Sequence, residues 1–396
     1  MRKYSVLFFL IMFMIGTDTF LISPLLPTLQ IQFGVSTDIA GWMLGAYTLG
    51  SAVFALIAGP LSDGWNRRIV LLCGLLGFSI STILCGFADS FWTMCLFRLL
   101  AGISAAFTAP QVWASIPAVM PASKISKTMG IAFSGLAASQ ALGVPIGSWL
   151  AAANWSVPFW TIGSVSLLLA VVVFYMLPDM KPSLQKGERT SILGRYVPLI
   201  TSGKARGGFF AYLLLHLGCG TAFTFVGRWM ADRFGLPVGQ IGTVMIFLGL
   251  GNLLGSMISA YAARKLGGAV KAVTMGMIVL VILYMVMPRL AGVSVVTTVY
   301  FTICTILGMI FPIVMGALTS LNASIRGTIS SLANATMNGA NTLGAWGAGV
   351  LYVQFGGYSS IGIFAGVCLA LSLWMFLSSG VLGRRSARTD KESAGV

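Results

Sequence analysis

Two residues of opposite charge lie inside otherwise apolar stretches of the chain. Asp18 stands within the first apolar run, and Arg98 follows Phe91, the start of a later run, by seven residues. A charged group in hydrocarbon is costly, so each residue is a candidate for function. The carboxyl group can bind and release a proton, whereas the guanidinium stays charged. Asp18 is therefore either a proton carrier or one half of a fixed structural salt bridge with Arg98.

His216 is the only histidine of the chain and lies near the middle of another apolar run. Because imidazole titrates near neutral pH, His216 is either a second protonation site or a neutral ring that hydrogen-bonds a neighbouring helix. The six cysteines stand singly, without C-x-x-C spacing. Together these residues predict no metal site and no cofactor.

Three asparagines at positions 334, 338 and 341 share one face of a predicted helix, since they are spaced i, i+4 and i+7. Lipid does not tolerate such a face, so Asn334, Asn338 and Asn341 should face the bundle or a wet cavity, where they either hydrogen-bond a substrate or join helices. Gln140 is a further polar candidate. The aromatic candidates for cavity walls, with packing as the alternative, are Tyr47, Trp113, Tyr212, Phe223, Tyr300 and Trp346.

The elements that hold these residues are predicted to cross a membrane. Of the 396 residues, 57% are hydrophobic and 8% are charged, whereas soluble domains carry about a quarter charged residues. A helix needs roughly 20 apolar residues to span the hydrocarbon. The predicted spans are 4–24, 39–59, 69–88, 91–115, 128–150, 158–177, 208–229, 239–262, 269–288, 292–316, 328–352 and 359–382.

The net charge of +15 reports topology through its placement. With both termini in the cytoplasm, 20 of the 24 Lys and Arg residues fall in cytoplasmic segments or at their edges, and only Arg228, Arg233 and Arg289 lie outside. This asymmetry follows the positive-inside rule. It predicts a multi-pass protein of the cytoplasmic (inner) membrane that attracts anionic lipid and binds no nucleic acid.

The twelve spans divide into two groups of six around a polar stretch. We expect a first bundle over 1–178, a cytoplasmic linker over 179–207, a second bundle over 208–382 and a basic cytoplasmic tail over 383–396. A short interfacial helix is expected near residues 192–200. A shift of 201 residues superposes three pairs, namely Gln140 on Asn341, Gly41 on Gly242 and Gly50 on Gly251. Duplicated halves around a site at the membrane midplane are typical of secondary transporters.

Four local patterns occur in order within the first 150 residues. They are Pro24-Leu-Leu-Pro27, Gly59-Pro-Leu-Ser-Asp63-Gly-Trp-Asn-Arg67-Arg68, Arg98-x-x-x-Gly102 and Gly143-Val-Pro145-Ile-Gly147. The second is similar to the loop motif G-x-x-x-D-R-x-G-R-R of the major facilitator superfamily, from which it departs at Gly64 and Asn66. The chain resembles that superfamily and, within it, the twelve-helix drug:proton antiporters, a branch that also contains sugar and metabolite exporters.

The resemblance implies an all-α integral membrane fold of twelve helices in two pseudo-symmetric six-helix bundles, in which helices 1 and 4 are neighbours. Asp18 precedes the expected outer end of helix 1, near Leu25, by seven residues, and Arg98 lies seven residues into helix 4. We therefore expect the two at the same depth, as an ion pair or a water-bridged pair.

The resemblance also assigns the motif residues to gating. It implies that Asp63 forms a latch between the halves that closes the inner gate, although a solvated loop carboxylate is the alternative. The residues of the gating motifs are Gly59, Asp63, Arg67, Arg68, Gly102, Gly143, Pro145 and Gly147.

These features favour a proton-coupled antiporter that exports small organic compounds or drugs by rocker-switch alternating access and works as a monomer. The alternatives are a sugar or metabolite exporter and an uptake symporter. A channel would need a selectivity filter or a charged ring, and the sequence contains neither. An enzyme would need a convergent set of nucleophile, base or metal ligands, so we expect no enzymatic activity.

Overall fold

The computed structural model describes residues 2–62, 65–180, 194, 196–322 and 326–383, and no strand occurs in these ranges. The helices of the first half are α1 (Arg2–Phe33), α2 (Thr37–Ala40), α3 (Trp42–Ser62), α4 (Arg67–Cys85), α5 (Phe91–Val119), α6 (Ala122–Ala138), the π-helical turn η1 (Ser139–Gly143), α7 (Val144–Ala153) and α8 (Val157–Met176). The remaining helices are α9 (Val197–Thr201), α10 (Gly203–Phe234), α11 (Val238–Lys265), α12 (Ala269–Val286), the 3-10 turn η3 (Met287–Arg289), α13 (Val293–Thr319), α14 (Arg326–Gln354) and α15 (Tyr358–Ser379).

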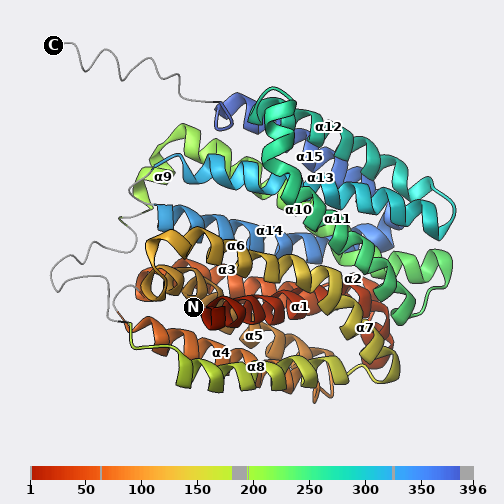
Figure 1. Cartoon of the computed structure of the whole chain (residues 1–396). Coiled ribbons are helices and arrows are strands. Elements are labelled where there is room, and N and C mark those ends of the chain that lie inside the picture. The colour runs from red at the N-terminus through yellow and green to blue at the C-terminus, as the bar shows by residue number, and fades with distance from the viewer. Residues whose placement is uncertain (1, 63–64, 181–193, 195, 323–325, 384–396) are drawn as a thin grey trace, which may run out of the picture.

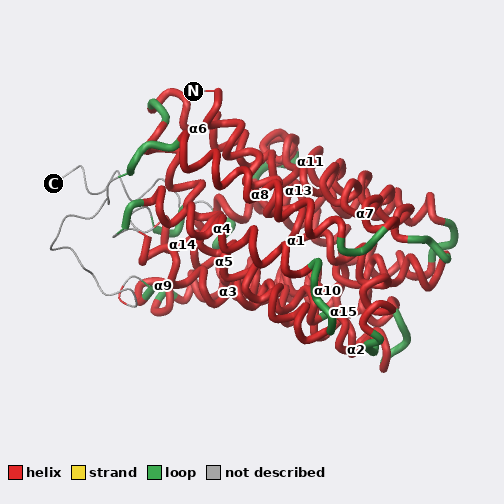
Figure 2. Tube along the Cα trace, turned by 90° about the horizontal axis from the view of Figure 1, so that it is seen from below, coloured by secondary structure: helices red, strands yellow, loops and turns green. Residues whose placement is uncertain are grey.

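The helices make twelve crossings, as predicted. In the described ranges, eleven helical stretches are long and apolar enough to cross a membrane. The twelfth crossing is α14, which has 29 residues and carries the three asparagines. Crossing two combines α2 with α3, and crossing five combines α6, η1 and α7. Figure 2 shows the helices side by side along a common direction.

The end of the first helix is the main departure from the predicted spans. Helix 1 was expected to end near Leu25, but α1 continues to Phe33 with Pro24 and Pro27 inside it. A proline inside a helix removes one hydrogen bond without always breaking the helix. Here Pro27 has no N–H to offer the carbonyl of Ser23, and Gly227 of α10 packs against that carbonyl. Packing against the second half therefore holds the helix together where local preference would end it.

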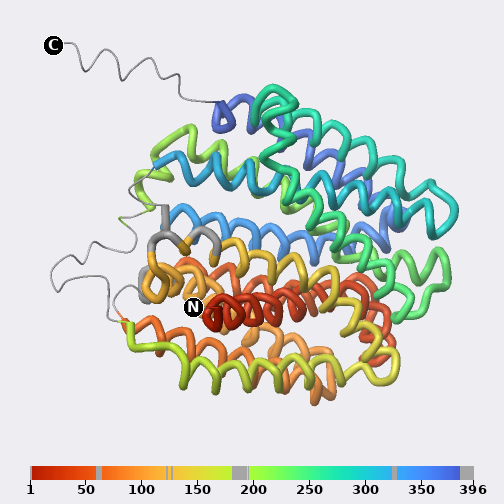
Figure 3. Tube along the Cα trace, viewed as in Figure 1, coloured from red at the N-terminus to blue at the C-terminus, as the bar shows by residue number. Residues whose placement is uncertain are grey.

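The two halves of the chain form separate bundles that repeat one packing pattern. Figure 3 shows the red-to-yellow first half below the green-to-blue second half. A Cβ atom added to Gly50 would lie 2.5 Å from the carbonyl oxygen of Leu99, and one added to Gly251 would lie 2.5 Å from that of Phe301. The pair matched by the shift of 201 residues thus makes the same close helix contact in both bundles.

The bundles meet most closely at the end far from the chain termini. Because the number of crossings is even, α1 begins and α15 finishes at one end, here called the terminal end, and the opposite end is the distal end (Figure 1). At the distal end, Arg228 donates to Gln30 across the interface at 2.8 Å. A Cβ atom at any of four glycines in this region would overlap the other half; they are Gly41, Gly227, Gly242 and Gly349. We call them the distal glycines.

Candidate functional site

A cavity of about 1920 Å³ lies between the two halves. Its walls come from α1, α3, α5 and α6 in the first half and from α10, α11, α13 and α14 in the second. It also reaches Pro198 beside the linker and Thr328 at the start of α14, so it extends to the terminal end. The distal glycines hold the opposite end closed. The described state is therefore open toward the terminal end alone.

All of the predicted cavity residues lie on this wall except Trp346, which does not line the cavity and is 51% exposed. Those on the wall are Tyr47, Trp113, Gln140, Tyr212, Phe223, Tyr300, Asn334, Asn338 and Asn341, together with His216. The three asparagines do not act alike, because the amide of Asn338 donates to the side-chain oxygen and to the carbonyl of Asn334, both at 3.0 Å. Asn341 makes no hydrogen bond with another described residue. Contact of these residues with a substrate stays a prediction.

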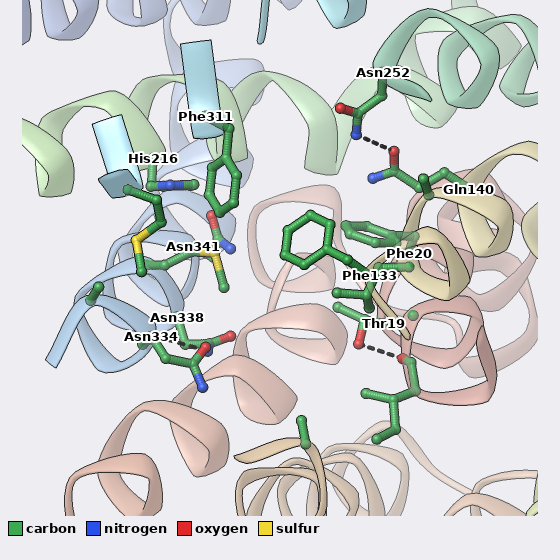
Figure 4. Close-up of a pocket in the computed structure, with 18 of the residues that line it drawn as sticks. Thr19, Phe20, Phe133, Gln140, His216, Asn252, Phe311, Asn334, Asn338 and Asn341 are labelled. Carbon is green, nitrogen blue, oxygen red and sulfur yellow. Dashed lines mark hydrogen bonds between the residues drawn. The ribbon is translucent and has the colours of Figure 1, made fainter. Parts of the chain in front are cut away.

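The sequence interpretation missed several residues that face the cavity. Asn252 of α11 donates to Gln140 of η1 at 2.6 Å and so joins the halves near mid-depth. Phe133 and Phe311 approach from opposite halves with ring centroids 6.4 Å apart, and Phe20 meets Phe223 at 5.8 Å. Figure 4 shows Phe20 and Phe133 facing Phe311 across the pocket. A lone asparagine in an apolar run could have been noticed, whereas the phenylalanines carry no signal in such a sequence.

Asp18 and Arg98 form the expected ion pair, with 2.7 Å between the guanidinium Nη1 and the carboxylate Oδ2. Both side chains are 0% exposed. Arg98 also donates to the carbonyl oxygens of Asp18 and Met43, each at 3.3 Å. Its guanidinium carbon lies 4.5 Å from the centre of the Tyr47 ring. A pair this buried is held by the hydrogen bond that Arg98 donates to a third helix, α3, as well as by its own charge.

The ion pair does not line the cavity but lies directly behind its wall. Thr19 and Tyr47 both line the cavity, and their hydroxyl groups are 3.0 Å apart. Thr19 follows Asp18 in the chain, and the Tyr47 ring covers Arg98. Within the described residues, Oδ1 of Asp18 is buried without a hydrogen-bond partner. One carboxylate oxygen is thus free to accept a proton, a short step from the cavity.

His216 occupies an aromatic corner of the opposite wall. Its ring lies 4.4 Å from that of Tyr212 and 5.9 Å from that of Phe311, edge-on in both cases. Nε2 of His216 is buried and has no hydrogen-bond partner among the described residues. The alternative of a neutral ring bonded to a neighbouring helix through this nitrogen is therefore not realised in this state.

The glycines of the motifs Arg98-x-x-x-Gly102 and Gly143-Val-Pro145-Ile-Gly147 allow close helix contacts near the ion pair. A Cβ atom at Gly102 would overlap the carbonyl of Tyr47, and one at Gly143 would overlap the hydroxyl of Thr17. Gly147 packs on Leu21, where an added Cβ atom would lie 2.6 Å from Cδ1. Pro145 follows the π-helical turn η1, whose last bond joins the N–H of Val144 to the carbonyl of Ser139. Because proline has no N–H, an ordinary helix could not continue here with all its bonds.

The loop motif is described only in part. Asp63 and Gly64 lie outside the described residues, and Gly59 is in α3. Arg67 donates to the carbonyl of Ala114 at 2.8 Å, and Arg68 pairs with Asp179 at 2.9 Å. The pKa of Asp179 is held below its usual value, chiefly by the hydrogen bond from Asn66 and next by the hydrogen bond and charge of Arg68. These contacts lie within the first half, so a latch to the second half stays a prediction.

Comparison with known proteins agrees with this architecture. The model of the Major Facilitator Superfamily matches residues 8–336. The uncharacterized MFS-type transporter YceJ of Bacillus subtilis (strain 168) is 45% identical over 381 residues, which cover 96% of this chain and 97% of that protein. Multidrug resistance protein 1 of the same organism is 26% identical over 232 residues, 57% of this chain and 58% of its own.

A solved structure extends the likeness to the whole fold. A bacterial homolog of the human lysosomal transporter Spinster, in an inward-facing and occupied conformation, superposes with a TM-score of 0.76. The superposition covers 98% of this chain and 99% of the other at 15% identity, so it shows the fold alone. The chain has twelve helices in two pseudo-symmetric bundles with a cavity between them, and the family model matches most of its length. We conclude that the chain belongs to the major facilitator superfamily and is a multi-pass membrane transporter.

Proposed function

We propose that the protein is a proton-coupled antiporter that exports small organic compounds, drugs among them, across the cytoplasmic membrane. It works as a monomer by rocker-switch alternating access, with both termini in the cytoplasm. The observation that carries the proposal is the buried Asp18–Arg98 pair behind the cavity wall, with Oδ1 of Asp18 unpartnered among the described residues.

The chemistry of the pair suits proton transfer. With Asp18 ionised, the pair is neutral overall and stable in a buried site. Protonation of Asp18 removes the negative charge and leaves the Arg98 cation uncompensated, which favours a different packing of the surrounding helices. We assign the relay between the cavity and the carboxyl group to the hydroxyl groups of Thr19 and Tyr47, which bond to each other on the cavity wall and not to Asp18 in the described state. A proton can therefore exchange with the cavity while the pair itself stays dry.

Export is supported by the shape and lining of the cavity. With the termini in the cytoplasm, the described state opens to the cytoplasm, the side from which an exporter takes its cargo. The volume of about 1920 Å³ exceeds the usual range for ligand sites, roughly 300–1,000 Å³, so it suits bulky or varied compounds. One relative is named a multidrug resistance protein, and we extend that activity to this chain as part of the proposal.

The test uses purified protein in proteoliposomes with a fluorescent aromatic compound chosen by its export from an efflux-deficient host. Wild-type protein should release or take up protons when a gradient of this compound is imposed. Asp18→Asn should bind the compound but lose at least about 90% of the proton flux. The matched control is Asp89→Asn, which removes an exposed carboxylate of the first half that bonds to Thr93 and should keep full coupling. Normal coupling in Asp18→Asn would end the proposal.

A further inference from the structure

We propose that the corner of the cavity around His216 is a subsite for aromatic carboxylic acids. His216 and Asn341 hold the two carboxyl oxygens, and Tyr212 and Phe311 hold the ring. This inference deepens the proposed function, on which it rests for the transport of a small organic compound. It assigns His216 to substrate recognition and leaves Asp18 as the proton carrier.

The first observation is an unsatisfied nitrogen. Nε2 of His216 is buried and has no hydrogen-bond partner in the described part of the chain. Burying a polar group without a partner is costly, and native structures seldom leave one so. Because His216 lines the cavity, a ligand in the cavity can supply the partner. The nitrogen is thus an unsatisfied hydrogen-bonding group just beneath a mostly apolar wall, which a ligand reaches by displacing the side chains that cover it.

The second observation is the aromatic surroundings of that nitrogen. Tyr212 stands one turn before His216 on α10, and the centroids of their rings are 4.4 Å apart. The ring centroid of Phe311 is 5.9 Å from that of His216 and 6.5 Å from that of Tyr212. Aromatic rings prefer neighbours at such centroid distances in edge-on or offset arrangements. From the other half, Phe133 adds its ring 6.4 Å from Phe311. A flat aromatic ligand placed here contacts rings from both halves.

The third observation is a free amide one helical turn away. Asn341 packs against Gly220, where an added Cβ atom would overlap its side-chain oxygen. Gly220 follows His216 by four residues, so the Asn341 amide of α14 lies against α10 one turn beyond His216. Asn334 and Asn338 bond to each other, whereas Asn341 makes no hydrogen bond with a described residue. Figure 4 shows Asn341 beside Phe311 and His216.

A carboxyl group matches this pair of contacts. One oxygen bonds to Nε2 of His216, and the second accepts from the amide N–H of Asn341. A neutral imidazole with a carboxylic acid and an imidazolium with a carboxylate contain the same proton and the same total charge. The acid can therefore enter with its proton or share the proton of the histidine, and the net charge of the filled site is the same. A carboxamide of the same shape has no acidic proton and gains less from the imidazole.

The test compares 2-naphthoic acid with 2-naphthamide, two fluorescent probes of nearly equal shape. Binding to the full-length protein is measured in detergent at one fixed pH, without any gradient. Wild-type protein should bind the acid at least about tenfold more tightly than the amide, as expected for a charge-assisted hydrogen bond. His216→Phe keeps an aromatic ring and should weaken acid binding about tenfold or more, with amide binding within about twofold of wild type.

Three further variants separate recognition from general damage. Phe311→Leu should weaken acid and amide equally, because it removes a ring contact that both probes use. Met315→Leu, a volume-conserving change on the same wall, should leave both affinities unchanged. His216→Gln keeps a hydrogen-bonding group and should retain part of the preference for the acid, and it decides the question if His216→Phe does not fold.

Equal affinities for the two probes in wild-type protein, or equal losses in the His216 variants, would overturn the subsite. The result is independent of proton coupling, since no gradient is present. A preference for the acid that depends on His216, combined with normal coupling in Asp18→Asn, would keep the subsite and reject the antiporter mechanism. Loss of coupling in Asp18→Asn with no preference for the acid would do the reverse.

Discussion

Arg98 is held by side-chain, backbone and aromatic groups at once, and few substitutions can meet all three. Its guanidinium reaches Asp18, the carbonyl of Met43 and the face of Tyr47. A lysine would bring the charge but not the planar fork that bonds two oxygens of Asp18 together. The position therefore depends on geometry as well as on charge.

Removing only the cation should leave Asp18 charged and unpaired in a dry site. We expect Arg98→Met to lower the free energy of unfolding by about 3–5 kcal/mol. The double variant Asp18→Asn/Arg98→Met contains no buried charge at this site and should recover most of that stability while lacking proton coupling. Thermal unfolding in detergent, followed by tryptophan fluorescence, measures both. A double variant as unstable as Arg98→Met would show that the pair stabilises the fold through packing rather than through charge compensation.

A second residue-scale prediction concerns the room that Gly220 leaves for Asn341. Gly220→Ala places a methyl group where the Asn341 oxygen now lies. We expect the displaced amide to weaken binding of 2-naphthoic acid about three- to tenfold, the range for loss of one ordinary hydrogen bond. Gly339→Ala is the control, because nothing lies within 4 Å of an added Cβ atom there. Equal binding by the two variants would contradict the placement of Asn341.

Sequence reasoning reached Asp18, Arg98 and His216 because ionisable residues are rare in apolar spans. It reached the asparagines through their helical spacing. Asn252, Phe133 and Phe311 became visible only in three dimensions, since their importance depends on which helices face each other across the cavity. Phenylalanine is common in membrane helices, and no local pattern separates a ring that faces a cavity from one that faces lipid.

At the scale of elements, the distal glycines let segments from the two halves approach closely, in most cases backbone to backbone. Gly41 packs against the carbonyl of Ala345 in α14, and Gly242 packs against Ser148 in α7. These two glycines were matched in sequence by the shift of 201 residues, and they occupy corresponding places in the two bundles. The sequence did not predict that α1 continues past Leu25 to Phe33. The contact that supports this extension joins Gly227 of the second half to the Ser23 carbonyl, and no local pattern reports a contact between the halves.

Filling one of these contacts should separate the halves at the distal end. In a cysteine-free protein with spin labels at Ile31 and Arg233, electron–electron distance measurements report the distal opening. Gly41→Ala should shift the distribution to longer distances, because its Cβ atom overlaps the Ala345 carbonyl. Gly347→Ala has open space around it and should leave the distribution as in wild type. An unchanged distribution in Gly41→Ala would show that the contact yields without opening the distal end.

At the scale of the whole molecule, the placement of basic residues makes a prediction about orientation. Because the sequence assigns 20 of the 24 Lys and Arg residues to cytoplasmic segments or their edges, the terminal end should face the cytoplasm. Green fluorescent protein fused after Gly383 should fluoresce, and alkaline phosphatase inserted after Gly235 in the distal loop should be active. The opposite pattern would invert the topology and make the described cavity open to the outside.

The distal glycines also bear on the cost of the conformational switch. Backbone-to-backbone contacts hide little apolar surface, so parting them forfeits little of the roughly 25 cal/mol per Å² that apolar burial supplies. The glycine contacts themselves therefore add little to the free-energy difference between the two end states. A shift from 1:99 to 99:1 needs only about 5.5 kcal/mol, and one elementary charge moving through 100 mV supplies about 2.3 kcal/mol. In the proposed mechanism, binding of the proton and the cargo then supplies the free energy that selects between the two states.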